Sequence, residues 1–348
     1  MKKIIIILLI AIGLSGCGND KVNANMNYEV GVFITKDSNY KSQIQYFDKD
    51  LNHVESRNLR YAALETHFRQ TDYYNNLMYL VPVGIFNKKD TKKVLEYDLG
   101  QHSIKEYDVD RINIQDVAAN DKYIYSISNL NWKGYLTQIN KDNQFVNELI
   151  TDEIPELVVC IEDKVFVFMV DLSTEGKSLI SVLDKNLNLI RNIDTSTLGV
   201  HIKKYAIADN KLYFSATQAT DEISDCIGIL DLTDYSLNKI EIKAHEVGDM
   251  IAYDGYLYVS HSNEATISSN TISKMNLNNY NDITTYNSYS NIMRMEIIDD
   301  SMYILGRKDD QYYLEKYDVT NSFEYVNKVK IEKSDKMYVS SLFVNKHE

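Results

Sequence analysis

The stretch DKDLNH at residues 48–53 carries the most immediate suggestion of chemistry in the chain, because it places Asp, Asp and Asn at alternate positions. Oxygen ligands spaced in this way begin a helix-flanked calcium loop, which also needs Gly at its sixth place and a bidentate Glu at its twelfth. Here those places hold His53 and Leu59, and the flanking residues alternate as strands do. The stretch therefore predicts a turn between strands and not a calcium site.

Three histidines with two neighbouring glutamates, His201, His245, His261, Glu246 and Glu264, are of residue types that could hold a metal ion. No short spacing such as His-x-x-x-His ties them together, and the sequence has no Gly-rich phosphate loop, Gly-x-Ser-x-Gly elbow or Cys-x-x-Cys pair. We therefore predict no metal ligands, no catalytic residues and no cofactor.

The N-terminus carries the most specific signal. Lys2 and Lys3 precede an apolar run, residues 4–14, that is too short to span a hydrocarbon core of ~30 Å, so it predicts a secretion signal. Leu-Ser-Gly-Cys at 14–17 resembles the lipobox of bacterial lipoproteins. That resemblance implies cleavage before Cys17, a diacylglyceryl thioether on its sulfur and, in many species, acylation of the new amine. The alternative is an ordinary signal peptide with an incidental cysteine.

Composition limits the partners. From Cys17 onward the chain keeps 35 of the 37 Lys+Arg and all 50 Asp+Glu, a net charge of 35 − 50 = −15. An acidic surface repels phosphate backbones, so we expect no nucleic-acid partner. Cys160 and Cys226 are too few for a disulfide framework, and two small buried thiols are favoured over a single bridge.

An aromatic strand pattern recurs along the chain. The chain has 27 Tyr residues, and many of them sit in short alternating runs that follow a polar turn. Their steps are 45, 42, 47, 45 and 45 residues when aligned on Tyr79, Ile124, Phe166, Tyr213, Tyr258 and Tyr303. Such runs predict half-buried strands, and the step is the length of one four-stranded propeller blade.

A second feature recurs with the same phase. A strand ends seven times in an apolar residue followed by Asp or Asn, at 47–48, 97–98, 139–140, 183–184, 230–231, 275–276 and 317–318. Asp and Asn start such turns because their side chains accept a backbone hydrogen bond two residues on. DKDLNH is the first of these seven turns.

The third recurring feature is a strand before each aromatic run, at 62–68, 114–119, 155–161, 204–208, 247–252 and 292–298. This leaves the N-terminal unit one strand short, and residues 339–345 supply it. We predict an all-β fold, a seven-bladed β-propeller closed by a C-terminal strand that completes the N-terminal blade. The alternative is that residues 335–341 open a truncated eighth blade. The domain boundaries are 1–16 for the signal peptide, 17–27 for the lipidated cysteine and a flexible tether, and 28–348 for the propeller.

The chain matches no particular propeller family, since it lacks Trp-Asp ends and paired glycines and has one Trp. Propellers in general bind ligands on the face formed by the loops that join second to third strands and successive blades. The residues we assign to binding on that face are Phe86, Lys88, Lys89, Trp132, Lys133, Glu175, Asp221, Glu222 and Glu264. The first-strand residues expected to line the channel are Glu65, His67, Asp116, Asp249, Arg294 and Glu296.

Two function classes follow. The favoured one is a non-catalytic binding or assembly module, lipid-anchored at the extracytoplasmic face of the cell membrane, whose partner is an envelope protein, a peptide or a glycan. The alternative is a metal-dependent lactonase or lyase of the kind that some propellers host. Fold alone does not separate them.

Cys17→Ala should leave the precursor unlipidated, because the thioether sulfur is lost. Metabolic labelling with a radioactive fatty acid checks this, and normal labelling of the variant would refute the assignment.

Overall fold

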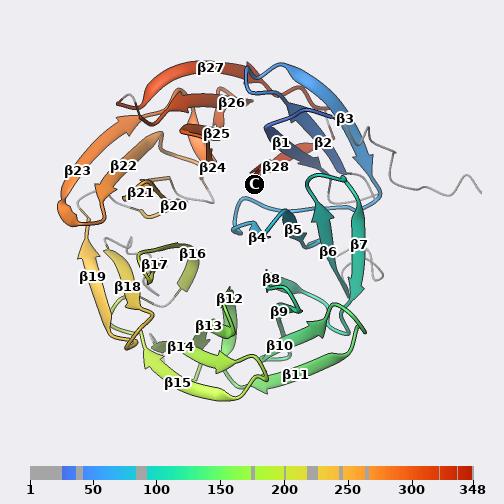
Figure 1. Ribbon diagram of the computed structural model, residues 1–348, viewed down its shortest axis with the longest axis vertical. Coiled ribbons are helices and arrows are strands. Elements are labelled where there is room, and N and C mark those ends of the chain that lie inside the picture. The colour runs from blue at the N-terminus through green and yellow to red at the C-terminus, as the bar shows by residue number, and fades with distance from the viewer. Residues whose placement is uncertain are drawn as a thin grey trace, which may run out of the picture.

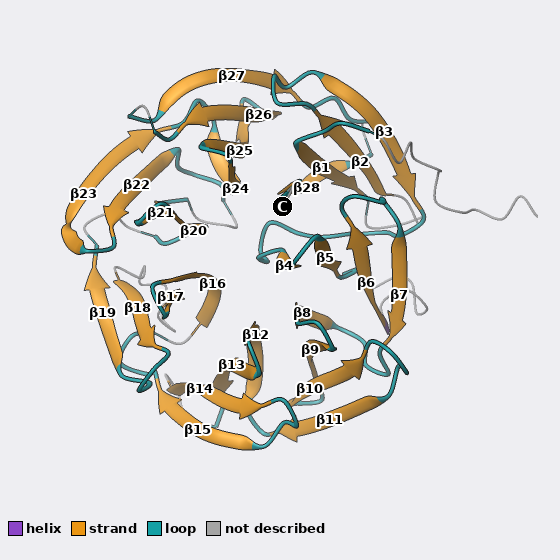
Figure 2. Ribbon diagram, in the orientation of Figure 1, coloured by secondary structure: helices purple, strands orange, loops and turns teal. Residues whose placement is uncertain are grey.

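Seven sheets of four antiparallel strands stand in a ring about a central axis (Figures 1 and 2). The fold is an all-β, seven-bladed β-propeller, as predicted. The computed structural model describes residues 26–36, 42–83, 92–173, 177–199, 201–217, 226–242, 246–262, 266–320, 322–334 and 336–346. Among these residues, no helix has the length and apolar character needed to cross a membrane.

The four strands of each blade lie side by side from the central axis to the outside, and the innermost strand is given first. Blade 1 has β28 (Tyr338–Val344), β1 (Val30–Thr35), β2 (Ser42–Phe47) and β3 (His53–Leu59). Blade 2 has β4 (Asp72–Tyr74), β5 (Leu77–Leu80), β6 (Lys93–Asp98) and β7 (Ile104–Asp108). Blade 3 has β8 (Ile114–Ala119), β9 (Tyr123–Leu130), β10 (Lys133–Asn140) and β11 (Val146–Thr151). Blade 4 has β12 (Ile154–Ile161), β13 (Lys164–Asp171), β14 (Lys177–Asp184) and β15 (Leu189–Asp194).

The remaining blades follow the same order. Blade 5 has β16 (His201–Ala208), β17 (Lys211–Thr217), β18 (Cys226–Asp231) and β19 (Leu237–Glu241). Blade 6 has β20 (Met250–Tyr253), β21 (Tyr256–Ser260), β22 (Thr271–Asn276) and β23 (Asn279–Asn287). Blade 7 has β24 (Asn291–Ile298), β25 (Ser301–Lys308), β26 (Gln311–Asp318) and β27 (Glu324–Lys330).

The recurring tyrosines are buried between blades. Their rings fill the gaps between neighbouring sheets while the hydroxyls reach polar partners, which is how Tyr is accommodated in a core. The Tyr79 hydroxyl donates to Glu96 Oε2 at 3.0 Å, and the Tyr46 and Tyr97 hydroxyls bond each other at 2.7 Å. The tyrosine-rich repeat therefore supplies the inter-blade core.

All seven predicted Asp or Asn turns are present between third and fourth strands. Asp48 Oδ1 accepts from the backbone N–H groups of Asp50 at 2.9 Å and Asn52 at 2.8 Å. A matching backbone bond is made by Asp98, Asn140, Asp184, Asp231, Asn276 and Asp318. The carboxylate of Asp48 is thus used by its own turn, which confirms the structural interpretation of DKDLNH.

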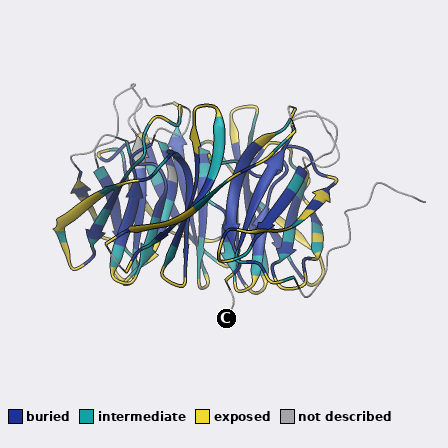
Figure 3. Cartoon of the chain, turned by 90° about the horizontal axis from the view of Figure 1, so that it is seen from above, coloured by how far each residue is buried: buried dark blue, intermediate teal, exposed yellow. Residues whose placement is uncertain are grey.

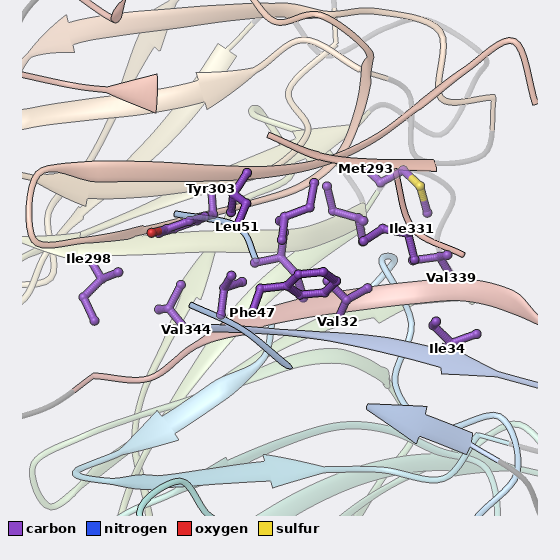
Figure 4. Close-up of a cluster of buried hydrophobic side chains, with 14 residues drawn as sticks. Val32, Ile34, Phe47, Leu51, Met293, Ile298, Tyr303, Ile331, Val339 and Val344 are labelled. Atoms are coloured by element: carbon purple, nitrogen blue, oxygen red, sulfur yellow. The ribbon is translucent and has the colours of Figure 1, made fainter. Parts of the chain in front are cut away.

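The ring closes as predicted. Strand β28 pairs with β1 from Val30↔Val344 to Thr35↔Tyr338, so residues 335–341 do not open an eighth blade. Figure 4 shows the apolar cluster at this junction, where Val32 of blade 1 and Val339 of β28 lie near Met293 of blade 7.

One predicted strand is wrong. Residues 62–68 are not the inner strand of blade 2, which is instead the three-residue β4. The pattern AALETHF alternates like a strand, but Ala63 and Glu65 adopt positive φ angles of 47° and 58°, which break an extended backbone. The other five predicted first strands overlap β8, β12, β16, β20 and β24, although β20 begins only at Met250.

The ring has two unlike faces. We call the face with the loops that join second to third strands and successive blades the top face, and the opposite one the bottom face. Strand β1 begins at Val30, opposite Val344 at the end of β28, so the chain enters and leaves the propeller at the bottom face. The side view in Figure 3 shows buried strands between the two faces and exposed turns along both edges.

Phe343→Ala should lower the free energy of unfolding by about 3–5 kcal/mol, because it opens a cavity in a packed core. Phe343 is 0% exposed and its ring packs against Tyr28, Phe33 and Tyr97. Urea denaturation checks this. The control is Phe145→Ala, whose side chain is 67% exposed and whose loss should cost less than about 0.5 kcal/mol. Equal costs for the two variants would contradict the role given to β28.

Candidate functional site

Two of the predicted binding residues, Trp132 and Lys133, are described, and both lie at the top face where β9 turns into β10. The predicted residues that lie outside the described part of the chain are Cys17, Phe86, Lys88, Lys89, Glu175, Asp221, Glu222 and Glu264. The assignment of these residues to binding therefore stays a prediction.

Trp132 is displayed against its own conformational preference. Trp132 is 82% exposed. It belongs to a two-residue turn in which Asn131 and Trp132 have φ angles of 53° and 61°. Such turns favour Asn followed by Gly, and a side chain held in the left-handed region costs roughly 1–2 kcal/mol. Because Trp132 is mostly exposed to solvent, packing contacts offset little of this conformational cost.

The turn that carries Trp132 lies against blade 4. Lys133 pairs with Asp152, and a Cβ on Gly134 would collide with the backbone of Glu153 and with the ring of Pro155. Only Gly fits there, because the hairpin contacts the connection into β12 so closely. Trp132 therefore stands at the top of the boundary between blades 3 and 4.

An apolar groove of about 260 Å³ follows that boundary down the side of the propeller. Ile150 and Leu189, which also line the groove, are 56% and 58% exposed. Its other apolar lining consists of Leu136, Leu149, Pro155, Val167, Met169, Leu179, Leu183 and Leu187. By contrast, the junction of blades 4 and 5 is packed with Phe166, Phe168 and Phe214. We call Trp132, Ile150, Leu189 and this groove the blade 3–4 surface.

The central channel is crossed by residues 65–71, which we call the plug. This segment leads into β4 and extends toward the axis (Figure 1). Lys204 of β16 donates to the backbone oxygens of His67 at 2.7 Å and Arg69 at 2.9 Å. Arg294 of β24 also donates to the backbone oxygen of Arg69. The plug, which begins next to blade 2, is thus held by blades 5 and 7.

The two cations that hold the plug share carboxylates. Asp249 lies 3.7 Å from Lys204 Nζ and 3.4 Å from Arg294 Nε, and Glu296 lies 3.4 Å from Arg294 Nη2. Burial disfavours the charge of Arg294, but Asp249 and Glu296 outweigh it and raise the pKa of the guanidinium. Arg294 therefore stays charged inside the channel.

The channel carboxylates also join neighbouring blades through backbone N–H groups. Asp72 accepts from Ala119 at 2.9 Å, Asp116 from Val158 at 3.0 Å and Asp249 from Met295 at 2.7 Å. In each case a carboxylate from one blade fixes the inner strand of the next. Burial raises the pKa of Asp116 to about 7. These hydrogen bonds give the carboxylates a structural role, which is to join neighbouring blades.

Most of the residues predicted to line the channel do so. Asp116, Arg294 and Glu296 lie on inner strands and Asp249 precedes one, whereas Glu65 and His67 belong to the plug. The sequence interpretation missed Arg69, Asp72, Lys204 and Tyr205. Lys204 could have been found from the sequence KKYAIA, because a charged residue stands there beside the apolar residues of an expected inner strand.

The described histidines have other partners. His261 is buried, donates from Nδ1 to the backbone oxygen of Glu246 at 2.9 Å and accepts at Nε2 from the Ser273 hydroxyl at 2.7 Å. Burial lowers the pKa of its imidazole, so this neutral form is favoured. His201 Nδ1 lies 2.6 Å from Glu156 Oε1. Within the described ranges no three His, Cys, Asp or Glu side chains are grouped as metal ligands. His245 and Glu264 lie outside those ranges.

Cys160 and Cys226 are not joined by a disulfide, as the sequence favours, but both are half-buried and not fully buried as predicted. They lie on β12 and β18, in different blades. Burial raises the pKa of the Cys160 thiol to about 12. Cys160 is therefore a poor nucleophile near neutral pH.

Comparison with known proteins supports the fold alone. No family model and no curated protein sequence matches the chain. Apo AztD from Citrobacter koseri is similar in structure, with a TM-score of 0.58 at 10% identity over 90% of this chain and 97% of that one. A protein from Desulfotomaculum acetoxidans has a TM-score of 0.57 at 12% identity, over 90% and 99% of the two chains. The dihydro-heme d1 dehydrogenase NirN gives 0.56 at 12% identity, over 92% and 76%.

Lys204→Met should destabilise the protein by about 3–5 kcal/mol, because it removes a buried donor to the backbone oxygens of His67 and Arg69 and one of the two cations beside Asp249. Amide hydrogen exchange of residues 66–71 should also become faster, which mass spectrometry checks. The control is Lys185→Met, which breaks an exposed pair with Asp163 and should cost about 0–1 kcal/mol. Unchanged exchange in the plug would contradict the tethering role of Lys204.

Proposed function

We propose that this chain is a non-catalytic, lipid-anchored module that binds a partner protein at the extracytoplasmic face of a bacterial cell membrane. The observation that carries the proposal is the display of Trp132, 82% exposed in a left-handed turn that its residue type disfavours. Strain that persists without a gain in packing is a mark of function.

The blade 3–4 surface has the character of a protein-binding patch. Trp is enriched among the residues that dominate binding energy, and such residues work beside apolar pockets that exclude water. Here an exposed Trp stands on the hairpin that contacts Glu153 and Pro155, which line the apolar groove, and Ile150 and Leu189 of the same groove are exposed. A partner that covers Trp132 can insert an apolar side chain into the groove.

The point at which the chain enters the propeller agrees with an anchor at Cys17. The described chain begins at Met26 and reaches β1 from the bottom face. Cys17 and Met26 are 26 − 17 = 9 positions apart in the sequence, and that length of chain spans at most roughly 30 Å. An anchor there directs the bottom face toward the membrane and leaves Trp132 on the side away from it.

The channel supports binding over catalysis. Asp72, Asp116 and Asp249 accept backbone N–H groups of the next blade, and Lys204 and Arg294 hold the plug. Groups committed to such contacts are poorly placed to act as acid, base or nucleophile. The metal-dependent enzyme that the sequence leaves as an alternative would need those groups to be released.

Trp132→Gly should abolish partner capture while leaving the fold as stable as before or up to ~1 kcal/mol more stable, because Gly adopts the left-handed turn without strain. Crosslinking on intact membranes followed by mass spectrometry measures capture, and urea denaturation measures stability.

The matched control is Phe145→Ala, which also removes an exposed aromatic side chain, but from a turn at the bottom face. It should leave capture unchanged. If Trp132→Gly captures the same partner as the unaltered chain, or if it unfolds more easily, the role given to Trp132 is wrong.

A further inference from the structure

A second pocket lies in the channel on the bottom side of the plug. Its volume is about 190 Å³, and its walls come from β4, β16, β20 and β24. Lys346, which follows β28 toward the bottom face, lines it as well. It therefore lies apart from the blade 3–4 surface, which is on the outside of the ring.

Two residues that line this pocket each carry a buried polar group without a hydrogen-bond partner within the described chain. These groups are the Thr71 hydroxyl and the Arg294 Nε–H group, on residues that are 4% and 1% exposed. The contacts of Arg294 with Asp249 and Glu296, both at 3.4 Å, are longer than the ~2.7–2.9 Å of a strong charge-assisted hydrogen bond. Leaving buried donors unpaired is costly, so the site is suited to a ligand that offers oxygen atoms.

The charges of the lining select against ions. Arg294 and Lys346 are balanced by Asp249 and Glu296, so an anion meets two carboxylates and a cation meets two basic groups. A neutral ligand can bond to both kinds of group without separating the existing pairs. It needs several hydroxyls, because the lining offers both donors and acceptors.

The rest of the lining supplies hydroxyls and an apolar wall. Tyr73 and Tyr205 contribute rings with hydroxyls, and Met250, Ile251 and Ala252 form an apolar stretch of β20. A sugar ring has hydroxyls around its rim and C–H groups on its faces, so it is complementary to this combination. Apolar walls with a few placed polar groups are typical of small-molecule sites.

We propose that the pocket below the plug binds a neutral monosaccharide. The proposal does not depend on partner binding through Trp132, because the two sites use different residues and lie on different parts of the ring.

The test is titration calorimetry of the purified full chain with D-glucose, D-galactose and N-acetyl-D-glucosamine. Glucosamine, glucuronate and galacturonate are the charged counterparts. At least one neutral sugar should bind saturably, and its charged counterpart should bind at least about tenfold more weakly. Absence of saturable binding by every neutral sugar, or equal binding of the charged ones, would overturn the proposal.

Two variants locate the site. Thr71→Val keeps the shape of the side chain but removes the hydroxyl, and should weaken sugar binding about tenfold without lowering the melting temperature. Ala252→Phe should fill the pocket and abolish binding, whereas Trp132→Gly should leave it intact. A lower melting temperature for Thr71→Val with unchanged affinity would show that the hydroxyl has a structural role, against the proposal.

Discussion

The pairing of β28 with β1 is the contact on which the rest of the propeller depends. Blades pack face to face around a ring, so each one is covered on both sides only if the first and last blades meet. The C-terminal strand makes that contact by becoming the innermost strand of the N-terminal blade. Phe343 then enters a cluster of aromatic rings from blades 1 and 2. Closure therefore fixes the channel, the two faces and the positions of both chain ends.

The channel acts as a polar axis that ties blades together. Carboxylates of one blade accept N–H groups of the next inner strand, and two buried cations, from blades 5 and 7, hold the plug. Buried charges are costly unless they are paired and hydrogen-bonded, so these contacts form a connected set. The plug divides the channel, and the Thr71 hydroxyl and Arg294 Nε–H group, two of the channel groups without a hydrogen-bond partner in the described chain, belong to residues that line the pocket below it.

The outside of the ring differs from blade to blade. Aromatic rings fill the junction of blades 4 and 5, whereas aliphatic side chains leave a groove between blades 3 and 4. Trp132 stands above that groove on a turn fixed by the close contact of Gly134 with the next connection. The boundary between blades 3 and 4 therefore differs from the boundary between blades 4 and 5, although the same repeat builds both.

The sequence by itself determined the repeat: the spacing of aromatic strands and the seven Asp or Asn turns predict the blade number, the phase and the closing strand. These signals are local, because a turn or an alternating strand is specified by residues close together in the chain. The sequence also singled out Trp132. Only the tertiary structure decided that residues 65–71 form a plug, and that Lys204 and Arg294, 294 − 204 = 90 residues apart, hold it. Their convergence depends on the closed ring, which no local pattern encodes.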